Sequence, residues 1–229
     1  MAKVIGRRRS VAERAYQRLR LAILECRLAP GQRLTEASIA KELQVGETPA
    51  REALRQLVLE GLMRVTPRHG YAVAPVTLRD VHEIFELRML IEPATAAMAA
   101  RNSHPAFLAR LKELSQLGYA DGTQDSIRSF LRANTELHAH IAQGSGNHRI
   151  ARLLTQLLSE SERLINFGML SHPQSEKTVS EHQRLVEAFA NKDPELARQV
   201  TEEHIAATRQ MVLESLITNT SLREIPIGV

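Results

Sequence analysis

The residues best suited to chemistry in this chain are its histidines, which number nine against a single cysteine. Asn134 and His138 are four residues apart in an expected helix, so both side chains leave the same helical face. His182 stands at the start of an apolar helical pattern, and His204 lies within another, beside Ile205. Three neutral imidazoles and one amide oxygen inside a helical bundle would hold a divalent ion such as Zn or Ni with open coordination positions.

The spacing of these residues leaves other uses open, because nothing in the sequence requires the three helices to meet. Without a metal, the histidines would merely line a polar pocket. A zinc centre with open positions can also activate water for hydrolysis. The chain has no HExxH motif, and no Glu or Asp is identifiable as a general base beside the site. We therefore do not expect an enzyme.

An arginine in an apolar segment is a second candidate for ligand binding. Thr77 and Asp80 have the spacing of a helix start. The residues that follow are apolar around most of the helix, which predicts a buried element: Val81, Ile84, Phe85, Leu87, Met89, Leu90 and Ile91. A buried arginine usually has a partner. Arg88 either pairs internally with Glu92, four residues on, or faces a cavity and binds an anionic effector.

Two short helices joined by a tight turn are expected near the start of the chain. The first begins at Thr35 and ends near Leu43, residues 44–46 form the turn, and Thr48 starts the second. This is the layout of a helix-turn-helix, whose second helix places its N-terminal residues in the major groove of DNA. Arg51 is placed for a base contact, since a guanidinium can bond guanine in a fork.

A β-hairpin is expected directly after these helices. Residues 62–66 and 71–74 alternate like strands, around a basic tip. After a helix-turn-helix, such a hairpin is a wing that lies against the DNA backbone or the minor groove. The predicted DNA contacts are Arg33, Glu47, Thr48, Arg51, Arg55, Arg68, His69 and Gly70.

The charges are divided unevenly along the chain. Residues 1–75 carry 14 Lys and Arg against 7 Asp and Glu, and the remainder carries 16 against 19, which gives the net charge of +4. A charge asymmetry of this kind indicates that one part meets a polyanion. Together with the motif, it favours double-stranded DNA as the partner of the first part.

The remainder of the chain shows helical patterns without strand-like alternation. Further helices are expected at 104–118, 125–143, 147–167, 174–191 and 194–220, separated by glycine, proline and capping residues. The predicted fold is mainly α: a winged helix-turn-helix domain over 1–75 and an all-α bundle of about six helices over 76–229. The lone Cys26 fits a reducing compartment. No secretory signal or membrane span is recognisable, so we expect a cytoplasmic protein.

The segment PGQRLTEASIAKELQVGETPAREALRQLVLEGLM resembles the DNA-binding head of the GntR family of bacterial transcription regulators. The resemblance covers nearly the whole head. It departs from the family at Gly46 and Glu47, where Ser or Thr followed by Arg is usual. In that family the arginine contacts DNA, so Glu47 places an anion where a cation is expected. Glu47 either accepts from cytosine N4 in an altered operator, weakens binding, or only caps its helix.

The second part resembles the FCD-type effector domain of the FadR subfamily. The segments FLRANTELHAHIA, SEHQRLVEAFANKD and ARQVTEEHIAATRQ resemble its three signature helices. In many members an Asp or Asn and three His on these helices bind a metal beneath a ligand cavity. Here those positions are Asn134, His138, His182 and His204, and the neutral amide leaves the set without a carboxylate.

These resemblances imply a regulator that binds a palindromic operator as a homodimer, and repression is its more frequent action. Its effector would be a small organic acid, anchored by the metal and held at its other end by Arg88. A metal-sensing regulator and a metal-free regulator remain the alternatives.

Overall fold

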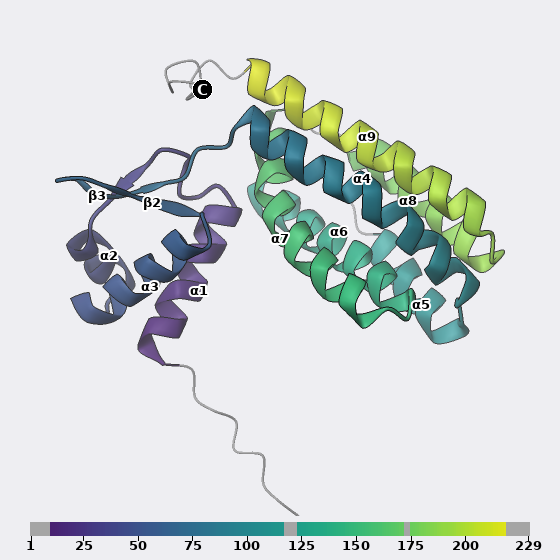
Figure 1. Cartoon of the computed structure of the whole chain (residues 1–229), viewed down its shortest axis with the longest axis horizontal. Coiled ribbons are helices and arrows are strands. Elements are labelled where there is room, and N and C mark those ends of the chain that lie inside the picture. Colours follow the sequence, from purple (N-terminus) through teal and green to yellow (C-terminus); the bar gives the residue numbers. More distant parts are fainter. Residues whose placement is uncertain (1–9, 117–122, 172–174, 219–229) are drawn as a thin grey trace, which may run out of the picture. The chain divides into compact units, whose positions relative to one another are not determined.

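The computed structural model describes residues 10–116, 123–171 and 175–218 of the 229-residue chain (Figure 1). The chain divides into two compact units that meet between Val76 and Thr77. The first unit combines three helices with a small sheet, and the described part of the second is helical. This arrangement confirms the predicted fold class.

The helices of the first unit are α1 (Val11–Leu24), α2 (Glu36–Leu43) and α3 (Glu47–Leu59). Thr35 caps α2, because the Ser38 N–H donates to its Oγ1 at 3.1 Å and the Ser38 hydroxyl accepts from its N–H. Helix α2 ends where Gln44 takes a left-handed φ of 56°. One core, from which water is excluded, holds the three helices together through apolar side chains that include Leu19, Ile23, Ile39, Leu54 and Leu57.

The sheet contains β1 (Arg33–Leu34), β2 (Met63–Thr66) and β3 (Gly70–Val73), antiparallel in the order β1-β3-β2. Strands β2 and β3 form the predicted hairpin, whereas β1 was not predicted, because two residues are too few to show alternation. Gly70 has a φ of +81°, and a Cβ there would lie 2.7 Å from the Leu34 carbonyl oxygen. Position 70 therefore requires glycine because the backbone of β1 lies so close. This structural requirement is independent of any contact that Gly70 makes with DNA.

The second unit is built around one long helix. Its elements are α4 (Leu78–Arg101), α5 (Pro105–Ser115), α6 (Gln124–Gly144), α7 (His148–Ser171), α8 (Ser175–Ala190) and α9 (Pro194–Thr218). Thr77 caps α4 by accepting from the Asp80 N–H, as the sequence predicts. Helix α4 runs beside α9 (Figure 1) and also packs against α6, α7 and α8.

Helix α7 passes through Gly168, where the sequence pattern had predicted a break. A Cβ at this position would lie 3.1 Å from atoms of both Met211 and Val212 on α9. The Ser215 hydroxyl donates to the Gly168 carbonyl oxygen at 3.0 Å. The absence of a side chain at Gly168 therefore allows α7 and α9 to approach closely, and this glycine does not end α7.

Helix α4 is not buried around its whole circumference, contrary to the prediction from its apolar sequence. Leu87 is 47% exposed and Leu90 is 70% exposed, and Leu153 on the neighbouring α7 is 53% exposed. Ile84 and Ile91 of α4 are half-buried against a core that includes Leu154 of α7. Leu87, Leu90 and Leu153 are called the outer stripe below.

Candidate metal centre

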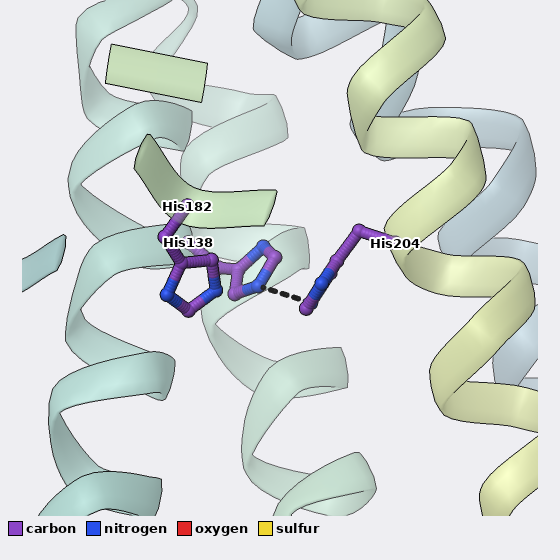
Figure 2. A group of neighbouring side chains, drawn as sticks. All are labelled: His138, His182 and His204. Carbon is purple, nitrogen blue, oxygen red and sulfur yellow. Dashed lines mark hydrogen bonds between the residues drawn. The ribbon is translucent and has the colours of Figure 1, made fainter. Parts of the chain in front are cut away.

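Three histidines from different helices meet inside the second unit (Figure 2). His138 on α6, His182 on α8 and His204 on α9 are 4%, 1% and 2% exposed. One ring nitrogen from each lies within 4.8 Å of the others. Asn134, one turn before His138, is 8% exposed. The structure therefore brings together the three predicted histidines, and Asn134 lines the same cavity as His204.

Helix α4 explains why these helices meet. Helices α6, α8 and α9 each pack against α4. A shared core of small and branched side chains includes Ala96 of α4, Leu137 of α6, Leu185 of α8 and Val200 of α9. Each histidine follows or precedes one of these buried positions by a few residues. Its side chain is therefore directed into the interior by the same packing that holds the bundle together.

A carboxylate contacts the Nδ1 atom of two of the three histidines. Glu92 on α4 lies 2.8 Å from His138 Nδ1, and Glu181 on α8 lies 2.7 Å from His204 Nδ1. In such contacts the Nδ1–H donates to the carboxylate, which fixes the tautomer and leaves Nε2 with a lone pair. Sequence reasoning had paired Glu92 only with Arg88 and had not singled out Glu181.

The Nε2 atoms of His138 and His204 face each other at 3.2 Å (Figure 2). With both Nδ1 atoms donating to carboxylates, neither neutral ring has a proton to place between them. Two lone pairs at this distance repel unless a cation lies between them. Two nitrogens bound to one tetrahedral zinc, at about 2.0–2.1 Å each, are separated by roughly 3.3 Å. The spacing fits two ligands of one ion.

Two further buried atoms lack a hydrogen-bond partner among the described residues, namely His182 Nε2 and Asn134 Oδ1. A buried polar atom without a partner costs about 1–3 kcal/mol, so each such atom needs a physical explanation. One divalent ion among the three histidines would satisfy His182 Nε2 and the facing Nε2 pair at once, and Asn134 Oδ1 is the predicted fourth ligand. The residues present therefore fit a divalent metal, through three imidazole nitrogens and one amide oxygen.

The surroundings favour the neutral imidazole, which is the form that binds metal. Burial lowers the pKa of His138, although the neighbouring Glu92 opposes this effect. Burial lowers the pKa of His182 further, well below its usual value, and the other two histidines add to the effect. Both rings are therefore unprotonated near neutral pH.

Arg88 forms the internal ion pair that the sequence analysis raised as one alternative. Its Nε lies 2.5 Å from Glu92, and its side chain is 0% exposed. The guanidinium also lies over the Phe85 ring, 5.2 Å from the centroid. Its two Nη atoms have no hydrogen-bond partner among the described residues. Those two donors are the ones that could still bind an anion.

A cavity adjoins the candidate centre. Its polar lining consists of Asn134, Glu181, His204, Thr178 and Thr208, and its apolar lining of Phe130, Ile165, Met169, Ala207 and Met211. A second, smaller cavity is lined by His138 together with Glu92, Thr95 and Thr201, among others. Arg88 lines neither of these two cavities.

The predicted DNA contacts lie on the surface of the first unit. Exposed side chains are found at Arg33, Glu47, Thr48, Arg55, Arg68 and His69, whereas Arg51 and Gly70 are half-buried. The Arg51 Nε donates to Glu36 at 2.7 Å, and the Tyr71 hydroxyl donates to the same carboxylate. Glu36 therefore orients Arg51 at the front of α3, a contact that the sequence analysis had not anticipated.

Both units match known protein families. Residues 11–73 match the profile of bacterial regulatory proteins of the gntR family, and residues 83–207 match that of the FCD domain.

Among the described residues, no helix has both the length and the apolar character needed to cross a bilayer.

Several curated proteins resemble the chain along most of its length. The HTH-type transcriptional regulator YdhC of Bacillus subtilis is 28% identical over 80% of this chain and 83% of its own. The transcriptional repressor GlaR of Escherichia coli is 24% identical over 89% and 96%. A probable D-xylose utilization operon repressor of Paenarthrobacter nicotinovorans is 27% identical over 87% and 88%.

Solved structures share the fold. McbR/YncC of Escherichia coli superposes with a TM-score of 0.75 at 23% identity, over 90% of this chain and 98% of its own. A putative GntR regulator from Rhodococcus gives 0.73 at 22% identity, over 89% and 97%. At these identities the likeness shows the fold alone.

Proposed function

The chain belongs to the gntR family of bacterial regulatory proteins and carries an FCD domain, and from this premise we propose that it is a ligand-responsive repressor that binds a palindromic operator as a homodimer. Members of this family regulate transcription and are not enzymes. Two of the relatives described above are named as repressors, which supports repression as the mode of action.

Helix α3 is proposed to enter the major groove, with Arg51 at a base edge and Arg55 at a phosphate. Arg33 and the wing residues Arg68, His69 and Gly70 would contact the backbone beside it. Glu47 and Thr48 are exposed in the first turn of α3. That position is where recognition helices contact bases.

The homodimer is proposed to form through the outer stripe on α4 and α7. Leu87, Leu90 and Leu153 expose apolar surface on two packed helices of the second unit, the helical body of the chain. Exposed apolar side chains that join into one contiguous patch mark interaction surfaces, and the proposal is that these three do so. A two-fold contact through the same face of each copy would place two heads for the two half-sites of a palindrome.

The effector is proposed to be a small organic acid bound in the cavity beside the four predicted ligands. A divalent ion such as Zn or Ni, held by Asn134, His138, His182 and His204, would supply open coordination positions for a carboxylate. The free Nη donors of Arg88 would bind a second group of the ligand in a fork, once the ligand reaches past Glu92. The observation that carries this proposal is the facing Nε2 pair of His138 and His204.

The dimer is proposed to hold its two heads either at the spacing of the operator half-sites or at a different spacing. An effector that binds more tightly to the second arrangement lowers the affinity for the operator. The same coupling makes operator DNA lower the affinity for the effector. Apart from DNA and the effector, a second copy of the chain is the only partner this mechanism needs.

Operator binding is tested by fluorescence anisotropy on duplexes that the protein selects from a random pool. A panel of small carboxylates is added to the metal-loaded protein and to protein treated with EDTA. Release of DNA by a carboxylate in the loaded protein alone supports the proposal. Release by metal without any carboxylate assigns a metal sensor, and release in both samples assigns a metal-free regulator. If the protein selects no duplex from the pool, even at low ionic strength, it is not a DNA-binding regulator.

A further inference from the structure

Two glutamates that contact the histidines are not among the four predicted ligands. Glu92 reaches His138 from α4, and Glu181 reaches His204 from α8, the helix that also carries His182. We propose that both are positioning residues of the metal centre, and that Glu181 supplies the negative charge that Asn134 does not. This inference rests on the metal site of the proposed function.

The positioning role follows from which ring atom each carboxylate contacts. Both contacts are made to Nδ1, at 2.8 Å for His138 and 2.7 Å for His204. Each carboxylate therefore holds the tautomer whose Nε2 lone pair is directed at the partner ring. His182 has no such contact among the described residues, and its Nε2 lacks any partner. The tautomers of His138 and His204 are thus fixed before an ion binds, whereas that of His182 is not.

The two carboxylates differ in the charge that they leave at the centre. Glu92 is shared between His138 and the guanidinium of Arg88, which is always protonated. That pair is neutral overall. Glu181 has His204 as its partner, and the ion pairs of the described residues give it no Lys or Arg. The predicted ligands, an amide and imidazoles that bind metal in their neutral form, bring no negative charge, so Glu181 supplies it next to the predicted ion.

Glu181 also has access to the ligand side of the centre. It lines the same cavity as Asn134 and His204, and 11% of its side chain is exposed. A carboxylate in this position attracts the cation by charge while it orients His204 by its hydrogen bond. Both effects strengthen metal binding, and substitutions can separate them.

Zinc affinity, measured by competition with a chromophoric chelator, separates the charge from the hydrogen bond. Glu181→Gln keeps an acceptor for His204 Nδ1–H but removes the charge, whereas Glu181→Ala removes both. We expect losses of about 10–100-fold, larger for Ala than for Gln. Adding a carboxylate within the ligand set, as Asn134→Asp in the Glu181→Gln background, is expected to restore most of the loss. Failure of this rescue overturns the charge role.

Glu203 provides the matched control. It precedes His204 in the chain but faces solvent, where it binds Arg184 at 2.7 Å. Glu203→Gln is expected to leave zinc affinity within about twofold, since exposed charges are well screened. An equal loss in Glu203→Gln and Glu181→Gln would overturn the inference, because a general loss of negative charge would then explain both.

Glu92 needs a different variant, because Glu92→Gln alone would leave the buried Arg88 charge without its partner. The double variant Arg88→Met with Glu92→Gln removes the pair as a unit. We expect it to bind zinc about 10-fold more weakly than wild type, with its folding checked by circular dichroism. Unchanged affinity in a folded double variant overturns the positioning role of Glu92.

Metal-free protein gives a readout that does not depend on zinc binding. Nitrogen NMR of histidine-labelled wild type, at about pH 8 where free imidazole is neutral, is expected to show the Nδ1–H tautomer at His138 and His204. Glu181→Ala is expected to release His204 into a mixture of tautomers and to leave His138 unchanged. If wild type shows the Nδ1–H tautomers but does not bind zinc, the proposed metal site is wrong, whereas the assigned tautomers still hold. A mixed tautomer in wild type would overturn the positioning inference, whether or not zinc binds.

Discussion

Arg88 and Glu92, one turn apart on α4, form an ion pair with only 0% and 5% of their side chains exposed. Burial alone would raise the pKa of Glu92, but Arg88 and His138 outweigh it and hold the pKa well below its usual range. Glu92 is therefore charged in the folded protein. The pair and the candidate metal centre share this one carboxylate, so stability and ligand binding are connected at α4.

Arg88→Met is expected to destabilise the body by about 3–5 kcal/mol, because it leaves a buried carboxylate without its cation. Urea unfolding of the metal-free protein measures this loss. Arg184→Met is the control, since its ion pair with Glu203 is 43% and 42% exposed and contributes about 1 kcal/mol or less. Equal losses in the two variants would show that the buried pair has no special role.

Removal of metal is expected to lower the melting temperature. An ion present at about 100 times its dissociation constant stabilises by about 2.7 kcal/mol, which corresponds to roughly 5–10 °C for a domain of this size. His182→Ala should abolish the zinc-induced rise, because its unpartnered Nε2 is a predicted ligand. His148→Ala, at an exposed position on α7, should keep it. A full rise in His182→Ala would remove that residue from the ligand set.

The two arginines of α3 are expected to differ in what their loss does to DNA binding. Arg51→Ala should cost about 1–3 kcal/mol and relax the preference at one base pair, whereas Arg55→Ala should weaken all duplexes alike and reduce the salt dependence by about one phosphate contact. Arg110→Ala, in an exposed ion pair of the body, is the control. Anisotropy titrations at several salt concentrations distinguish the three. Identical behaviour of Arg51→Ala and Arg55→Ala would contradict the assigned roles.

The outer stripe is expected to hold the dimer together. Leu90→Glu places a charge on a surface that is 70% exposed in the single chain, so the variant should fold normally but sediment as a monomer. Leu59→Glu serves as the control, because Leu59 is 88% exposed in the first unit. Sedimentation equilibrium measures both. A Leu90→Glu variant that remains dimeric would place the interface elsewhere.

The head is expected to lose stability at high pH through Tyr16. Burial and the hydrogen bond to Glu60 raise the pKa of Tyr16 to about 12, against about 10 in the unfolded chain. Between these values the unfolded chain releases a proton that the folded head keeps, so stability falls as pH rises. Tyr16→Phe should flatten this slope between about pH 10 and 12 in guanidinium unfolding. Tyr71, which donates to Glu36, shifts in the same direction and leaves a residual slope.

Local signals in the sequence predicted most elements of the fold. Capping residues such as Thr35 and Thr77 begin helices where expected, because a cap is a contact between neighbours in the chain. Strand β1 was missed because its pairing with β3 joins residues nearly forty positions apart. Gly168 was misread as a break because the helix that requires it, α9, lies far along the sequence.

The candidate centre could be predicted only in part. The helical patterns around the histidines, with the family resemblance, identified the three histidines that the structure brings together. Their convergence depends on how three helices pack on α4, which no local pattern encodes. Glu181 carried no signal of its own, since an acidic residue before a histidine is unremarkable until His204 is seen beside it. The binding of metal by these residues stays a prediction.

Helix α4 limits how this protein can be recombined with its relatives. Its inner side carries Arg88 and Glu92, and its outer side carries Leu87 and Leu90. One residue inserted between Arg88 and Leu90 would turn the rest of the helix by about 100°. Glu92 would then no longer face Arg88, and Leu90 would no longer lie on the same side as Leu87. Chimeras that exchange heads should therefore join the two chains before Thr77, and linker-length variants should be made there as well.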